Sequence, residues 1–420
     1  MHAPPRAAAR DPAPPAAPDE RGERLDALDI LRGFALLGMI LVHFHQKMRL
    51  EVSGAEELIG WIVWVGVEQK AWGTFAFLFG VGFAVLLRRL EARRVPAVPF
   101  YLRRLAGLAA FGLVAELCFG FHVLLEYAIW GVPLLLVRRW STRSLLALAV
   151  VAAALRPTIA AADALHAWWM LGPDGAAAAA PAAAAAADGR VLQQALHAAE
   201  QQDSYLALLR ARVAYFGWSW AQPRRWLPDV NLAPFIIGLL AVRHGVFDAP
   251  RRHVRLIAGW MAFGAASWAA AAWLLLRRVP ELPVPGLQWT LQYGLGLVQD
   301  QWLCLTYVGA VVLLLAYRPA WRGRLAPAGL AGRMALTNYM LQVAVLDALA
   351  SGYGLGLKLR PLVYVAATAL LFGAEVALSR WWLARYAFLP LEWAWRSMTY
   401  GRVQPMRRAA EPAIPAVPAA

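Results

Sequence analysis

An arginine and a histidine with ten residues between them lie in the first apolar stretch of the chain, RLDALDILRGFALLGMILVHFHQ, from Arg24 to Gln46. At about 100° per residue, these two residues, Arg32 and His43, share one face of an α-helix and lie about 16 Å apart along its axis. Asp29 lies near the same stripe. Imidazole gains or loses a proton near neutral pH, and ionisable groups at depth in a bilayer are costly. The stripe is therefore a candidate functional site, unless it is only a charged helix end with interfacial histidines.

The composition indicates a polytopic membrane protein rather than a soluble enzyme. Hydrophobic residues make up 60% of the 420 residues, and 20 residues are tryptophans. The two cysteines, Cys118 and Cys304, lie in apolar runs and fit neither a disulfide framework nor a zinc pattern, so no metal is expected. The net charge of +15 comes with arginines at the ends of hydrophobic runs, which predicts contact with membrane lipids and no nucleic-acid partner.

We predict an all-α polytopic membrane protein with about ten transmembrane helices. Hydrophobic runs long enough to span a bilayer occur near residues 27–46, 71–88, 102–119, 122–138, 144–165, 230–247, 255–276, 299–317, 334–350 and 361–384. The stretch 58–69 is too short to span alone, so it is either an interfacial helix or the outer part of a long, kinked second helix.

Charge and composition divide the chain into a transmembrane domain, residues 24–401, and two disordered cytoplasmic tails, 1–23 and 402–420. Arginines crowd alternate loops, as in 88–104, and the positive-inside rule then places both termini in the cytoplasm. The long loop 166–228 is predicted to be extracytoplasmic and to contain an amphipathic helix after its alanine tract. That helix either covers a substrate cleft or is a plain connector.

Several motifs resemble those of membrane-embedded acyltransferases. The run LDILRGFALLGMILVHF is similar to the first helix of the transmembrane acyltransferase superfamily, whose surface-glycan branch shares the arginine–histidine spacing described above. FYLRRLAG, with Arg103 and Arg104, resembles the entry to the third helix of that branch. More closely, GRMALTNYMLQ and LPLEWAWRSMTYG resemble the YeiB-like family of bacterial inner-membrane proteins. Many members of that family have Gly-Asp between their third and fourth helices, where this chain has Phe121-His122.

The resemblance implies an acyltransferase of the bacterial inner membrane. An acyl-CoA, most simply acetyl-CoA, would be the co-substrate on the cytoplasmic side, and the acceptor would be an envelope glycan or a lipid-linked, hydroxylated molecule. His43 would be catalytic, either as the base that takes the hydroxyl proton or as the nucleophile that carries the acyl group, with a structural or gating role as the alternative. His45, about 200° further round the helix, would face elsewhere. Such a protein could also form a homo-oligomer.

The same resemblance suggests residues for substrate binding, and each of them also has a plainer role. Arg32 either binds the CoA phosphates through its planar guanidinium or pairs with Asp29 at the helix end. Arg103 and Arg104 either bind the donor or act as topological determinants.

Two pairs of residues spaced four apart complete the set of candidates. Asn338 and Gln342 share one face of a predicted span, where they either bond neighbouring helices or contact a sugar or pantetheine. Glu392 and Arg396 are predicted to form an ion pair on a cytoplasmic amphipathic helix.

The sequence leaves two other classes of function open. A transporter or flippase could use Arg32 and His43 as a proton or anion relay, and a non-enzymatic membrane partner protein would need no polar site at all. The surroundings of His43 discriminate between these classes, because an enzyme needs a basic cytoplasmic mouth joined to an outer cleft.

Overall fold

The computed structural model describes residues 18–407, apart from residue 69 and the segments 172–179, 228–230 and 277–302. Within these ranges the regular structure is helical, with two isolated β-bridges, Arg49–Leu359 and Tyr386–Arg407. The predicted all-α fold is confirmed for this part of the chain.

The folded region extends slightly beyond the predicted transmembrane domain at both ends. Helix α1 (Pro18–Met48) begins inside the predicted N-terminal tail. At the other end, the carbonyl of Gln404 accepts a hydrogen bond from Trp393 Nε1 at 2.7 Å, so the chain beyond residue 401 packs back onto its own last helix. The rest of the two predicted tails, 1–17 and 408–420, lies outside the described residues.

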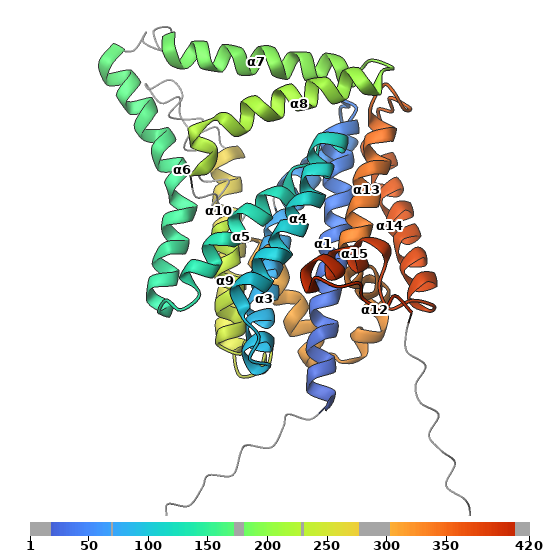
Figure 1. Cartoon of the computed structure of the whole chain (residues 1–420). Coiled ribbons are helices and arrows are strands. Elements are labelled where there is room, and N and C mark those ends of the chain that lie inside the picture. Colours follow the sequence, from blue (N-terminus) through green and yellow to red (C-terminus); the bar gives the residue numbers. More distant parts are fainter. Residues whose placement is uncertain (1–17, 69, 172–179, 228–230, 277–302, 408–420) are drawn as a thin grey trace, which may run out of the picture.

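Helix α1 lies at the centre of the bundle (Figure 1). It packs most extensively against α3 (Lys70–Ala92), α12 (Ala320–Arg333), α13 (Ala335–Ala350) and α14 (Pro361–Leu383). The middle of α1 is apolar on all sides, as expected of a helix surrounded by others. Its fully buried side chains there are Leu36, Met39, Ile40 and Val42.

Glycines let α1 and α12 approach until their backbones touch, at what we call the α1–α12 seam. A Cβ atom on Gly33 would collide with the carbonyl of Ala328, and one on Gly332 would collide with the carbonyl of Asp29. Small residues permit such close approach between helices in membranes. The seam therefore fixes the part of α1 around Asp29 and Gly33, which carries Arg32.

The remaining helices of the bundle surround this centre. Helix α4 (Ala97–Phe119) packs against α5 (Val123–Val137), and α9 (Leu232–Arg243) packs against both α3 and α6 (Thr142–Leu171). The C-terminal helix α15 (Pro390–Tyr400) lies against α4 and α13. The bundle also contains α10 (Val254–Leu276) and an apolar helix over Leu303–Tyr317.

The stretch 58–69 belongs to a long interrupted helix. Helix α2 (Ala55–Gly66) directly precedes α3, and a backbone hydrogen bond from Ala71 N to Val67 O at 3.1 Å crosses the interruption. The pair qualifies as one candidate membrane span, Ala55–Ala92. Of the two interpretations of this stretch, the structure supports the kinked second helix.

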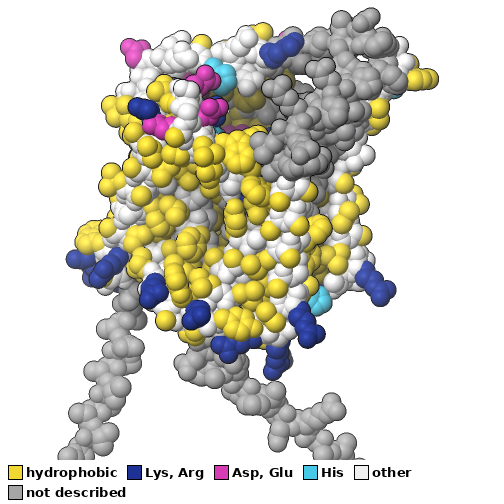
Figure 2. Space-filling model, turned by 180° about the vertical axis from the view of Figure 1, so that it is seen from behind, with side chains coloured by type: hydrophobic (Ala, Val, Ile, Leu, Met, Phe, Trp, Pro, Cys, Tyr) yellow, Lys and Arg dark blue, Asp and Glu magenta, His cyan; other side chains and the backbone are white. Residues whose placement is uncertain are grey.

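Among the described residues, three helices are long and apolar enough to cross a membrane: Asp26–Met48, Ala55–Ala92 and Pro361–Leu383. Four shorter apolar helices accompany them, Val123–Val137, Leu232–Arg243, Leu303–Tyr317 and Ala335–Ala350. Figure 2 shows hydrophobic side chains over the middle of one face, with lysines and arginines along the end where α1 begins. These observations fit a polytopic membrane protein, and the number of ten spans stays a prediction.

Two helices of the long loop lie across the opposite end of the bundle (Figure 1), which we call the capped end. They are α7 (Ala180–Glu200) and α8 (Tyr205–Ala221), followed by the short helix η2 (Pro223–Trp226). The sequence predicted one continuous amphipathic helix here. The chain instead breaks before Ser204, whose hydroxyl accepts a hydrogen bond from Ala207 N at 3.3 Å and so caps the start of α8.

Candidate active site

His43 lies in the core of the bundle, with 1% of its surface exposed. Its ring packs against Phe121, at 4.3 Å between centroids, and lies edge-on to Tyr339 at 6.3 Å. The imidazole Nδ1 has no hydrogen-bond partner among the residues that the structure describes. A buried nitrogen that is not used to hold the fold together is available for chemistry with a bound molecule.

Two further polar side chains on α13 are buried and lack partners within the described ranges. These are the hydroxyl of Tyr339, which is 3% exposed, and both amide atoms of Gln342, which is 0% exposed. Because α13 packs against both α1 and α4, the structure brings His43 together with a second helix that carries unpaired polar groups. Both roles predicted for Gln342, a bond to a neighbouring helix and contact with a sugar or pantetheine, stay predictions.

Asn338 has a different position from Gln342, although the two lie one turn apart. Its Nδ2 donates hydrogen bonds to the carbonyl of Ala331 and to Ser379 Oγ, each at 3.0 Å. These bonds join α13 to α12 and α14. The structure therefore gives Asn338 the interhelical role, one of the two roles that the sequence allowed.

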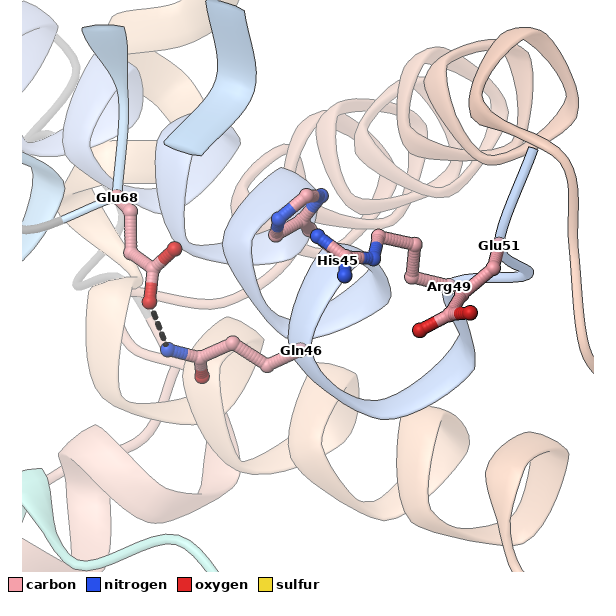
Figure 3. A pocket seen from close by; sticks show the side chains of 5 residues that line it. All are labelled: His45, Gln46, Arg49, Glu51 and Glu68. Atoms are coloured by element: carbon pink, nitrogen blue, oxygen red, sulfur yellow. Dashed lines mark hydrogen bonds between the residues drawn. The ribbon is translucent and has the colours of Figure 1, made fainter. Parts of the chain in front are cut away.

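His45 points away from His43, as the helix geometry predicted. Its Nδ1 lies 3.0 Å from the hydroxyl of Tyr364, on α14. It also lines a cavity of about 360 Å³ together with Gln46, Arg49, Glu51 and Glu68 (Figure 3). Gln46 Nε2 donates a hydrogen bond to Glu68 Oε1 at 2.7 Å within this cavity. The cavity thus opens beside His45 and not beside His43.

Arg32 forms an ion pair with Asp29 at 2.6 Å, so the anchoring role is present in the structure. Its side chain is nevertheless 32% exposed. Arg32 interacts electrostatically with Arg104, whose guanidinium lies 3.8 Å from the ring centroid of Trp395 on α15. Arg103 is exposed, and its guanidinium lies beside Gly401. Of the three predicted arginines, Arg32 lies on α1 and the other two lie on α4 next to α15, and phosphate binding by them stays a prediction.

The predicted ion pair between Glu392 and Arg396 is wrong. Glu392 instead accepts hydrogen bonds from Thr337 N at 2.8 Å and from Thr337 Oγ1 at 2.5 Å. Thr337 lies in the first turn of α13, where backbone N–H groups are unpaired and attract a carboxylate. Burial raises the pKa of Glu392, although these hydrogen bonds oppose the shift. The guanidinium of Arg396 lies over the ring of Phe388 at 4.5 Å.

Sequence reasoning also missed a buried ion pair between α8 and α13. Arg212 and Asp347 are 3% and 1% exposed, and their two hydrogen bonds measure 2.5 and 3.0 Å. Tyr353 and Ser351 also donate to the Asp347 carboxylate, at 3.0 and 3.1 Å. The available signal was an aspartate inside a predicted span, since such a residue usually has a partner.

Sequence comparisons place these residues in known families. Residues 241–402 match the family described as "Protein of unknown function (DUF418)". This C-terminal part of the chain is therefore similar to the DUF418, or YeiB-like, family. Residues 24–174 match a second family, "Heparan-alpha-glucosaminide N-acetyltransferase, catalytic". The second match contains Arg32, His43, Arg103 and Arg104, so the protein has a membrane acyltransferase-like domain at its N-terminal side.

Two relatives resemble the chain over nearly its whole length. "Uncharacterized protein YxaH" of Bacillus subtilis (strain 168) is 28% identical over 416 residues, which cover 93% of this chain and 98% of the relative. "Uncharacterized 39.9 kDa protein in amylase 3'region" of Bacillus acidopullulyticus is 25% identical over 400 residues, which cover 91% and 96%. No solved structure matches the chain significantly.

Proposed function

We propose that the protein is an acyltransferase of the bacterial inner membrane that moves an acyl group from cytoplasmic acyl-CoA, most simply acetyl-CoA, to a hydroxylated envelope molecule such as a glycan. The observation that carries the proposal is the buried, unpaired Nδ1 of His43 inside the region that matches an acetyltransferase catalytic family. A bundle built only as a scaffold has no use for such a nitrogen, because burying a polar atom without a partner is costly.

His43 acts as the general base in the transfer step. The acceptor hydroxyl oxygen attacks the thioester carbonyl carbon, so a C–O bond forms and the C–S bond breaks. The hydroxyl proton passes to the His43 imidazole and from there to the departing CoA thiolate. The products are the acylated acceptor and free CoA. In this scheme Phe121, which packs on the imidazole, moves aside when the substrates enter.

The donor phosphates bind at the end of the bundle where α1 begins. Arg32 and Arg104 interact electrostatically there, and Arg103 directly precedes Arg104 on α4. Guanidinium groups bind phosphate oxygens bidentately, which suits them to the diphosphate of CoA. The concentration of arginines in alternate loops supports the cytoplasmic orientation of this end and of both termini.

The test compares two histidines of the same helix. Purified protein in lipid vesicles is incubated with radiolabelled acetyl-CoA and with envelope fractions from cells that lack the gene, and labelled products are counted. His43→Ala should lose about 10²–10⁴-fold in turnover and keep its acetyl-CoA affinity. His45→Ala should keep most activity, because its ring faces Tyr364 and not the proposed site.

Three results would contradict the proposal. Turnover of His43→Ala at the wild-type rate would show that His43 is not the base. Loss of activity only in His45→Ala would place the chemistry on the face of α1 that carries His45. Absence of any labelled product from wild-type protein, combined with movement of a solute across the vesicle membrane, would favour the relay of a transporter.

A further inference from the structure

Five side chains from five different segments meet at the capped end, close to the surroundings of His43. We call them the outer cluster: Glu116 on α4, His122 in the α4–α5 turn, Glu126 on α5, Trp220 on α8 and Arg225 on η2. Arg225 pairs with Glu126 at 2.6 Å, and Trp220 Nε1 donates to Glu116 Oε1 at 2.9 Å. The guanidinium of Arg225 also stacks on Trp220, 4.6 Å from its ring centroid. His122 Nε2 lies 3.9 Å from Glu126.

The outer cluster and its neighbour Tyr339 contain buried polar atoms without hydrogen-bond partners among the described residues. The second oxygen of Glu116 is buried and has no partner among the described residues. The Tyr339 hydroxyl, which is also buried and unpaired, interacts electrostatically with both Glu116 and Glu126. The ring of Tyr339 also lies edge-on to His43, with 6.3 Å between the centroids, so Tyr339 is a neighbour of the imidazole as well as of the carboxylates.

The cluster also reaches the surface of the protein. The side chain of His122 is 44% exposed and that of Arg225 is 23% exposed, whereas that of Glu126 is 11% exposed. The ring of Trp72 lies edge-on to His122 at 6.4 Å, and its Nε1 has no hydrogen-bond partner in the described ranges. A molecule at the capped end can therefore contact His122 directly and meets buried polar atoms behind it.

The charges of the cluster select the kind of molecule. The guanidinium of Arg156, which donates to the carbonyl of Arg225 at 3.3 Å, adds a second positive charge beside the two carboxylates, but the unpaired oxygen of Glu116 still attracts a hydrogen-bond donor. Aromatic rings beside the carboxylates offer flat apolar surfaces with polar edges. Carboxylates that accept from hydroxyls, next to aromatic faces that cover C–H groups, suit a sugar ring.

We infer that the outer cluster binds the sugar ring of the acceptor and directs one of its hydroxyls past Tyr339 toward His43. This inference rests on the proposed function for the direction of the hydroxyl, but the binding of a sugar at the cluster can be tested without any transfer reaction.

The test measures binding of two probes, methyl β-D-glucopyranoside and D-glucosamine, by saturation-transfer NMR on full-length protein in a detergent without a sugar headgroup. Glu116→Gln, Glu126→Gln and His122→Ala should each weaken binding of at least one probe by tenfold or more. His122→Ala keeps the test valid if a carboxylate variant fails to fold, because that side chain is largely exposed. A stronger signal for the amino sugar than for the glucoside would show that the carboxylates recognise an ammonium group as well as hydroxyls.

Glu56→Gln is the matched control, because Glu56 is a carboxylate that pairs with an arginine, Arg360, outside the cluster. It should bind both probes as the wild type does. Equal binding by wild type and all three cluster variants, or no binding of either probe to the wild type, would overturn the inference. Lost sugar binding in the cluster variants together with an absence of acyl transfer in the wild type would leave this inference standing and refute the proposed function alone.

Discussion

Removal of Asp347 should detach α8 from the capped end of the bundle. In the wild type its carboxylate holds Arg212 through two hydrogen bonds, of 2.5 and 3.0 Å, and neither side chain is more than 3% exposed. Asp347→Ala would leave the guanidinium buried with no opposite charge, although its bond to the carbonyl of Cys118 would remain. Breaking one side of a buried ion pair costs about 3–5 kcal/mol, which is roughly a hundred- to several-thousand-fold in the equilibrium between the docked and detached states.

Limited proteolysis measures this equilibrium directly. The segment between α7 and α8, residues 201–204, becomes cleavable when α8 detaches, and the cleavage rate follows the detached population when opening is fast. Asp347→Ala should therefore be cut far faster than the wild type. Arg360→Ala, which breaks the exposed pair with Glu56, should change the rate little, because exposed pairs contribute under about 1 kcal/mol.

A double substitution separates charge burial from general disruption. The variant with both Arg212→Leu and Asp347→Leu buries no charge, so it should be cleaved more slowly than either single variant. Cleavage of Asp347→Ala at the wild-type rate would refute the role of the pair. If the double variant raised the cleavage rate by as much as the two single substitutions combined, packing and not charge would hold α8 in place.

Three more predictions follow from residues already described. Arg32→Lys should weaken acetyl-CoA binding in an equilibrium binding assay although the charge is kept, because lysine cannot form the bidentate contact; unchanged affinity in Arg32→Ala would exclude the residue from donor binding. Burial alone would raise the pKa of Glu200, but the ammonium of Lys47 at 2.7 Å and the nearby His197 lower it. The ion pair therefore stabilises the docked α7 fully at pH values above 4.5, the ordinary pKa of a glutamate, and this stabilisation is lost as the pH falls through the lowered pKa. Proteolysis at 201–204 should therefore rise at acidic pH in the wild type and much less in Glu200→Gln. Reporters fused after Tyr400 and inserted in 92–98 should lie in the cytoplasm and one at 201–203 should lie outside, and the same side for all three would contradict the topology.

Local geometry was enough to predict much of the centre of the molecule. The apolar runs predicted the helices, and the angle of about 100° per residue predicted that His43 and His45 face different neighbours. The kinked helix formed by α2 and α3 was one of the two alternatives for the stretch 58–69, because that stretch is apolar but too short to span a membrane. These features depend only on residues close together in the chain.

Contacts between distant segments could not be derived in the same way. Arg212 and Asp347 are 135 residues apart, and nothing in the sequence says that α8 lies against α13. Glu392 shows how a tertiary contact replaces a local one, since the free N–H groups at the start of α13 bind its carboxylate in place of Arg396. The outer cluster likewise depends on how α4, α5, α8 and η2 are assembled.

The seam between α1 and α12 limits the route by which a fatty or acetyl group can travel to His43. At Gly33 and Gly332 the two backbones leave no space even for a methyl group, so a pantetheine arm cannot pass between these helices. Another flank of α1 packs against side chains of α13, which can rotate, and α13 in turn contacts α4. The pantetheine arm and its acyl group would therefore pass from Arg32 to His43 along the side of α1 that faces α13 and α4. Bulkier side chains on that side should set the longest acyl chain that the protein accepts.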